Sequence, residues 1–176
     1  MAILHNNPVK KNILLLLSFT IGILFFNPAY SDVTAQLKTV GTAKLSWFMM
    51  DVYKASLHTE DGVYTDKQYP QALKIRYQRD FNKEVLVEAT AKEWQKMPIS
   101  RQQYKPWLKQ LSTLWPDVKR GDSITFLVAE NGQGSFYHNN RLLGQVDNME
   151  MSEAFLAIWL AQNTSQPRLR RQLIGG

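Results

Sequence analysis

The sequence predicts an α+β domain in which an antiparallel sheet is backed by a layer of helices. Stretches that alternate between polar and apolar residues come before and after a central stretch whose apolar residues recur every three to four positions. A further helical stretch follows the last alternating one. This order keeps the helices together instead of placing one between successive strands, which excludes an alternating βαβ arrangement.

The beginning of the chain has the three parts of a secretory signal peptide. Two lysines precede an apolar run at 13–26, and Ala29-Tyr30-Ser31 places small residues where a signal peptidase cleaves. We therefore expect residues 1–31 to be a signal peptide that is cleaved near Ser31/Asp32, and 32–176 to form one domain. An uncleaved membrane anchor is the alternative, but a spanning helix needs about 20 apolar residues and this run is shorter.

Composition narrows the possible functions. The chain has no cysteine, so no disulfide stabilises it and no lipid can be attached at a cysteine after cleavage. Without Lys10 and Lys11, 19 basic and 15 acidic side chains remain, a net charge of +4 that suits an anionic ligand or a lipid surface. Nucleotide-binding loops, a serine-hydrolase motif and zinc-ligand spacing are all missing from the sequence. We expect no cofactor, no metal and no nucleic-acid partner.

The first alternating stretches predict two strands. Residues 43–58 alternate as one long strand, which we expect to bend near Met50-Asp51. After a polar connector, residues 72–78 alternate again.

Two helices are predicted next. Asn82 is a suitable N-cap for the first, and Pro98 ends it. The second begins at about Arg101, becomes regular near Pro106 and ends at Pro116. The second helix has an apolar stripe that we expect to face the core, made of Tyr104, Trp107, Leu108, Leu111, Leu114 and Trp115. We also expect Trp94 in the core, on the first helix.

The remaining sequence predicts three strands and two helices. Two-residue turns at Asn131-Gly132 and Asn139-Asn140 separate the alternating stretches, which is typical of an antiparallel meander. The predicted strands are 122–130, 134–138 and 141–146. The first predicted helix, 151–160, is apolar almost all round. The second is 167–174, with Thr164/Ser165 as the signal for its start and Gly175 as the signal for its end. Arg168, Arg170 and Arg171 on the last helix suit either lipid headgroups or a solvated helix face.

A series of short motifs carries a family resemblance. They are Asp51-Val52-Tyr53, Leu73-x-Ile75-Arg76-Tyr77, Trp115-Pro116-Asp117-Val118, Phe136-Tyr137-x-Asn139, Ile158-Trp159-Leu160 and the Pro167-x-Leu169-Arg170-x-x-Leu173-Ile174-Gly175 tail. In this order they resemble the bacterial, exported chalcone isomerase-like proteins, over nearly all of 32–176. The resemblance implies a periplasmic protein with an open-faced sandwich fold, in which a cleft separates the sheet from the helices.

The resemblance also implies a choice between chemistries. Plant enzymes of this fold close a flavanone ring, whereas other members bind fatty acids without catalysis. The position of the enzymes' threonine falls on or near Phe48, which has no hydroxyl, and that of their arginine near Lys44. The first predicted helix also lacks the tyrosine that would polarise a ketone. Whether the protein is an enzyme is left open, with the balance against catalysis.

Three functions follow as hypotheses. The first is a periplasmic, non-catalytic binding protein for a small apolar or amphipathic anion such as a fatty acid, with Lys44, Arg76 and Tyr53 as ligand-binding residues. The second is an isomerase of the intramolecular lyase type on an enone-like substrate, with Ser46 or Tyr53 as the hydroxyl donor. The third is a structural envelope protein that acts through protein contacts. Contact with a membrane is possible in each case.

Overall fold

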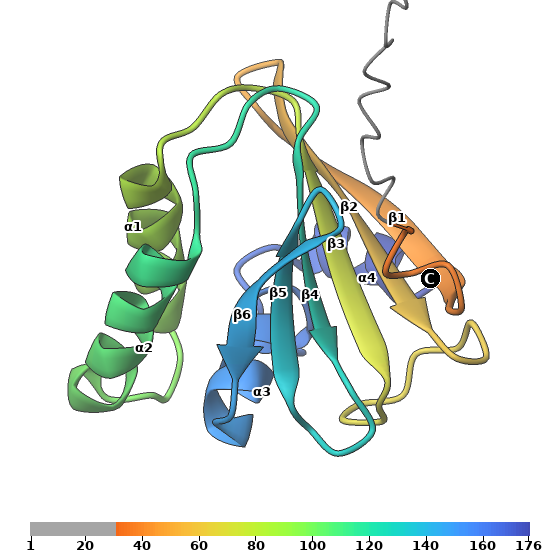
Figure 1. Ribbon diagram of the computed structural model, residues 1–176. Coiled ribbons are helices and arrows are strands. Elements are labelled where there is room, and N and C mark those ends of the chain that lie inside the picture. Colours follow the sequence, from red (N-terminus) through yellow and green to blue (C-terminus); the bar gives the residue numbers. More distant parts are fainter. Residues whose placement is uncertain (1–30) are drawn as a thin grey trace, which may run out of the picture.

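A six-stranded antiparallel sheet forms the centre of the computed structural model, which describes residues 31–176 (Figure 1). The predicted signal peptide lies outside these residues except for Ser31. The strands follow one another in the sheet in chain order. They are β1 (Lys38–Trp47), β2 (Met50–Thr59), β3 (Gln71–Tyr77), β4 (Ser123–Val128), β5 (Gly134–His138) and β6 (Arg141–Val146).

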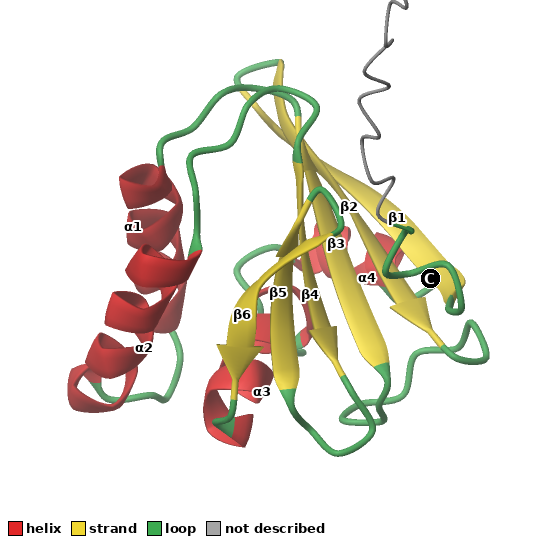
Figure 2. Ribbon diagram, viewed as in Figure 1, coloured by secondary structure: helices red, strands yellow, loops and turns green. Residues whose placement is uncertain are grey.

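Four helices lie within residues 31–176, and they leave one face of the sheet open. They are α1 (Lys83–Trp94), α2 (Arg101–Leu114), α3 (Met149–Leu160) and α4 (Pro167–Leu173). In the view of Figure 2, α3 and α4 lie behind the sheet, α1 and α2 form a pair beside it, and no helix crosses the front. This is the predicted α+β fold with an antiparallel sheet and a helical layer. None of the helices in this part of the chain is long and apolar enough to span a membrane.

The core lies between the sheet and the helices and is rich in aromatic rings. Phe126 of β4, Phe136 of β5 and Phe155 of α3 are almost fully buried, and their ring centroids are 4.3–5.0 Å apart. Trp94 and Trp115 are buried as well. Trp107 is also in the core, so the sequence-based placement of these three tryptophans is confirmed.

The prediction of one long strand over 43–58 is wrong. The chain turns back at Phe48 and Met49, whose φ angles of 47° and 64° are both positive, so that β1 and β2 form a hairpin. Positive φ at both central residues is the geometry that Asn and Gly favour in two-residue turns. Asn139 and Asn140 have it too, with φ angles of 48° and 69°, and there the turn was predicted. Phe48-Met49 gives no such signal in the sequence.

The predicted helices are confirmed, with shifted ends. Asn82 caps α1 and accepts a hydrogen bond from the Val85 N–H at 3.1 Å. Helix α2 is regular from Arg101 onward, before Pro106, because Ser100 and Gln103 form a capping box that stabilises its first turn. The last helix begins at Pro167, as predicted, but neither Thr164 nor Ser165 caps it: it follows Gln166 without a side-chain cap.

Candidate functional site

A largely apolar cavity of about 670 Å³ lies between the sheet and helices α1 and α3. Its volume falls in the range of about 300–1,000 Å³ that is typical of small-molecule sites. The sheet contributes Tyr53 of β2, Ile75 and Tyr77 of β3 and Ile124 of β4, while α1 faces the cavity with Ala89 and Thr90. These two side chains are small, which leaves space that larger ones would fill. The apolar side chains of the lining include Leu45, Val52, Ile75, Phe81, Val85, Leu86, Ile124, Phe155 and Ile158.

Two phenols line the cavity from neighbouring strands. Tyr53 of β2 and Tyr77 of β3 are direct cross-strand partners. The Trp159 indole N–H of α3 donates a hydrogen bond to the Tyr53 hydroxyl at 2.8 Å. Within residues 31–176 neither phenol donates a hydrogen bond to a protein acceptor. The Tyr53 oxygen already accepts a bond, so its proton is available for a ligand.

Burial keeps both phenols protonated. It raises the pKa of Tyr53 to about 12, although the hydrogen bond from Trp159 acts in the opposite direction and the charge of Glu93 adds to the rise. Burial, together with the neighbouring Tyr53, raises the pKa of Tyr77 well above its usual value. The cavity therefore offers hydrogen-bond donors, and not phenolate anions, at ordinary pH.

Charged side chains of α1 line the rim of this cavity. Glu93 forms an ion pair with Lys96 at 2.6 Å and accepts a hydrogen bond from the Ser165 hydroxyl at 2.7 Å. Lys92 also lines the cavity and is paired with Glu88 at 2.8 Å. The charge of Glu93 also acts on the Tyr53 phenol, whose pKa it raises. Exposed ion pairs are weak, so a ligand anion can compete for the lysines.

The structure does not bring the three predicted site residues together. Tyr53 lines the apolar cavity, whereas Lys44 and Arg76 lie on the open face of the sheet, in a shallow hollow of about 920 Å³ that Lys54 also lines. Lys44 is paired with Asp51 at 2.6 Å. The alternation of the strands explains the separation, since neighbouring residues of a strand point to opposite faces.

Sequence reasoning missed the lysines at the rim. Lys92 in the last turn of α1 and Lys96 just after its end are four residues apart, and they line the cavity together with the apolar positions 85, 86 and 89. This spacing was visible in the sequence. Nothing in it, however, indicated that this side of the helix borders a cavity and not solvent.

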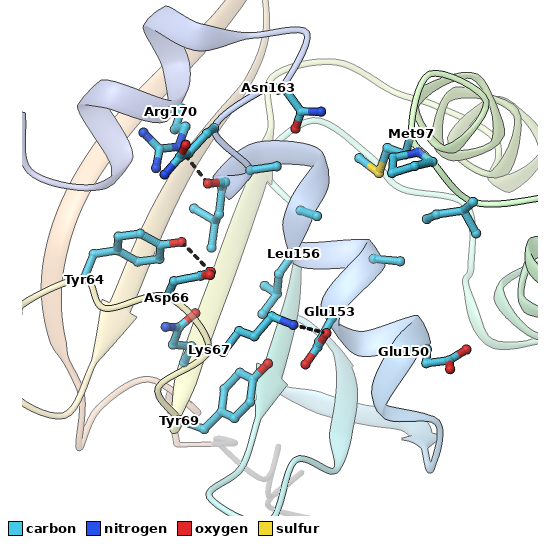
Figure 3. A pocket seen from close by; sticks show the side chains of 18 of the residues that line it. Tyr64, Asp66, Lys67, Tyr69, Met97, Glu150, Glu153, Leu156, Asn163 and Arg170 are labelled. Atoms are coloured by element: carbon cyan, nitrogen blue, oxygen red, sulfur yellow. Dashed lines mark hydrogen bonds and ion pairs between the residues drawn. The ribbon is translucent and has the colours of Figure 1, made fainter.

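A third hollow, of about 530 Å³, suits an anion less well (Figure 3). Asp66 and Glu150 line it, and Figure 3 shows Lys67 reaching toward Glu153, to which it is paired at 2.7 Å. The Tyr64 hydroxyl donates to Asp66 at 3.2 Å. Besides Asp66, Glu150 and Glu153, the hollow is lined by two cations, Lys67 and Arg170, so its charged side chains are negative on balance and repel an anionic ligand. The apolar cavity is therefore the better candidate site.

The histidine of the open face has a structural role. The His58 ring is within hydrogen-bond distance of the hydroxyls of Thr39 and Ser56, at 3.3 and 2.8 Å. Burial lowers its pKa, which favours the neutral ring. In the described part of the chain, no three His, Asp or Glu side chains come together as metal ligands would.

Comparison with known proteins assigns the family. The family model described as chalcone isomerase-like matches residues 27–175. The chain belongs to the chalcone isomerase-like family. An uncharacterised protein of Haemophilus influenzae is 26% identical to this chalcone isomerase-like protein over 157 residues, which cover 89% of the chain and 76% of that protein.

A solved structure of the same fold is a fatty-acid binding protein of Arabidopsis thaliana. It superposes with a TM-score of 0.63 and covers 84% of this chain and 90% of the plant chain. The two are 12% identical, so the likeness concerns the fold. Phe48, onto which the resemblance places the enzymes' threonine, lies at the exposed tip of the β1–β2 hairpin and does not line the apolar cavity.

Proposed function

We propose that this chalcone isomerase-like protein binds a long-chain carboxylate such as a fatty acid, without catalysing a reaction. The observation that carries the proposal is the apolar cavity of about 670 Å³ between the sheet and helices α1 and α3, which phenol hydrogen-bond donors and two exposed lysines also line. Such a cavity removes a hydrocarbon chain from water, which contributes about 0.8 kcal/mol for each buried CH₂ group.

The polar end of the ligand belongs beside Tyr53 and Lys96. Tyr53 donates a hydrogen bond, and Lys96 supplies the positive charge after it exchanges Glu93 for the ligand. A carboxylate that stays at the rim keeps part of its hydration, which avoids the large penalty of burying an ion in an apolar interior. The plant protein of the same fold, described as a fatty-acid binding protein, supports this choice of ligand.

The arrangement gives less support to an enone isomerase. That hypothesis relied on a hydroxyl, of Ser46 or Tyr53, and a cation, Lys44 or Arg76, meeting in one enclosed cavity. Tyr53 and the two cations line hollows on opposite faces of the sheet. Ser46 does lie near Lys44, since both contact Asp51, but Ser46 and Lys44 are exposed and not enclosed in a cavity. Only the binding function is therefore proposed.

The proposed location is the periplasm, after removal of residues 1–31. The support is the layout of the signal peptide in the sequence. Mass spectrometry of the protein from the periplasmic fraction checks it, and an N-terminus at Asp32 is the expected result. A chain that retains residues 1–31 contradicts this part of the proposal.

Calorimetric titration with dodecanoate tests the binding function. Ala89→Trp places a large ring in the cavity and is expected to weaken binding at least tenfold. Glu84→Trp is the matched control, because Glu84 is exposed on the same helix and does not line the cavity. Failure of the unaltered protein to bind fatty acids of any length between 8 and 18 carbons contradicts the proposal, as does equal binding by the two variants.

A further inference from the structure

The tip of the β1–β2 hairpin exposes large apolar side chains. Phe48 is 80%, Met49 100% and Met50 49% exposed. In Figure 1 this turn lies at the top of the sheet, at the end where the connections to and from the α1–α2 pair also pass. Consecutive exposed residues of this size are unusual on a soluble surface and mark a contact site.

The backbone conformation of this tip does not explain why its residues are large and apolar. Phe48 and Met49 have positive φ angles, a conformation that is unfavourable for large side chains and that Asn and Gly adopt easily. The turn geometry therefore gives no reason for Phe and Met at these two positions. A role for the side chains themselves accounts for both their size and their exposure.

Positive charge lies next to the tip, on the open face of the sheet. Lys44, Lys54 and Arg76 are direct partners across three neighbouring strands on the open face. The Arg79 guanidinium lies against the Met50 sulfur at 3.5 Å. Asp51, the acid of the tip, is already paired with Lys44.

This row of cations favours an anionic partner. Like charges directly opposite one another on a sheet repel, and a bound anion relieves the repulsion. Within residues 31–176 no ion pair is found for Lys54 or Arg76.

We propose that the hairpin tip docks the protein on an anionic phospholipid bilayer. Phe48 and Met49 enter the boundary between headgroups and acyl chains, and Lys54, Arg76 and Arg79 contact the lipid phosphates. Apolar residues flanked by Lys and Arg are the combination that binds such an interface. The charge complementarity favours a bilayer over a neutral protein surface. This inference goes beyond fatty-acid binding and does not depend on it.

The same hairpin joins the docking surface to the cavity. Leu45 and Val52, which line the apolar cavity, lie within four residues of the tip on either side. Docking would thus place one end of the cavity near the bilayer, where amphipathic ligands are dissolved.

Vesicle sedimentation tests the docking. The probe is vesicles of equal parts phosphatidylglycerol and phosphatidylcholine, compared with pure phosphatidylcholine. The decisive variant is Phe48→Asn/Met49→Gly, which supplies the residues that the turn prefers and so preserves the hairpin. We expect its melting temperature to be unchanged or higher, and its binding to the anionic vesicles to fall at least tenfold. Met49→Ser alone replaces it if the double variant does not fold.

Two further variants complete the design. Arg76→Gln is expected to weaken binding to the anionic vesicles about fivefold, since one cation near such a surface contributes about that factor. Val63→Ser is the control, because Val63 is 61% exposed in the loop after β2, at the other end of the strand. It should bind as the unaltered protein does. All proteins compared have the same N-terminus, so residues 1–31 cannot account for a difference.

Several results would overturn the proposal. They are failure of the unaltered protein to bind anionic vesicles, equal binding to both kinds of vesicle, and full binding by the tip variant. A tip-dependent dimer in solution without vesicle binding would assign the surface to a protein contact instead. Loss of vesicle binding with intact dodecanoate binding separates this inference from the proposed function.

Discussion

Replacing Tyr53 by Phe should lower both the stability of the protein and its affinity for fatty acids. The change removes only the hydroxyl that accepts the 2.8 Å hydrogen bond from the Trp159 indole. Trp159 is only 8% exposed, so its N–H is left without a partner in a nearly dry environment. An orphaned buried donor costs about 1–3 kcal/mol. We expect the free energy of unfolding to fall by about 1.5 kcal/mol, which corresponds to a fall in melting temperature of about 3–6 °C for a domain of this size.

Chemical denaturation measures the stability, and titration with dodecanoate measures the affinity, which should fall about tenfold. Tyr137→Phe is the matched control: Tyr137 lies on β5 opposite Thr125, on the open face of the sheet. A double-mutant cycle with Trp159→Phe should give a coupling energy of about 1 kcal/mol between the two side chains. If Tyr53→Phe changes neither stability nor affinity, the reasoning about this hydrogen bond and its role at the site is refuted.

Two further predictions concern contacts that hold helix α4 and Asp32 against the sheet. Gly41→Ala should destabilise the protein by about 3 kcal/mol, because a Cβ at this position would overlap the backbone carbonyl of Gln172 and force α4 away from β1. Urea denaturation measures this loss. Gly176→Ala is the control: Gly176 has room for a Cβ, so this substitution should leave the stability unchanged. Partial burial acts to raise the pKa of Asp32, yet hydrogen bonds and the ion pair with Lys74 lower it to about 2. This carboxylate therefore stabilises the fold above about pH 4, and the contribution is lost as the pH falls toward 2. Asp32→Asn should lower the unfolding free energy by about 1 kcal/mol at pH 7. This value is reduced for solvent screening, because the Asp32 side chain is 44% exposed. If the variant were less stable by the same amount at pH 2, the stabilisation would not come from the ionised carboxylate.

Most of the fold could be predicted because the sequence marks its elements locally. Gly132 in the β4–β5 turn and Asn139-Asn140 in the β5–β6 turn have positive φ, which these residue types favour, and Asn82 caps α1 as expected. The β1–β2 turn was missed because Phe48-Met49 carries no such mark. The choice of Phe and Met is explained by the apolar surface that they expose, and a local sequence pattern does not predict such a surface.

The candidate site was predicted only in part, for a geometric reason. The alternation of β2 and β3 places Tyr53 and Tyr77 on the helix side and Lys54 and Arg76 on the open side. That separation follows from the sequence once the strands are known. Which face holds a cavity depends on the packing of α1 and α3, where small side chains such as Ala89 leave space. Packing of this kind involves segments far apart in the chain, so spacing alone does not predict it.

The location of a bound fatty acid tests the central claim most directly. Nuclear Overhauser contacts between ¹³C-labelled dodecanoate and the protein would give that location. The account predicts contacts from the methylene groups to Ile75, Leu86 and Phe155, and from the carboxyl end to Tyr53 and Lys96. Contacts confined to the open face of the sheet, or a ligand without contacts to the cavity lining, would contradict it.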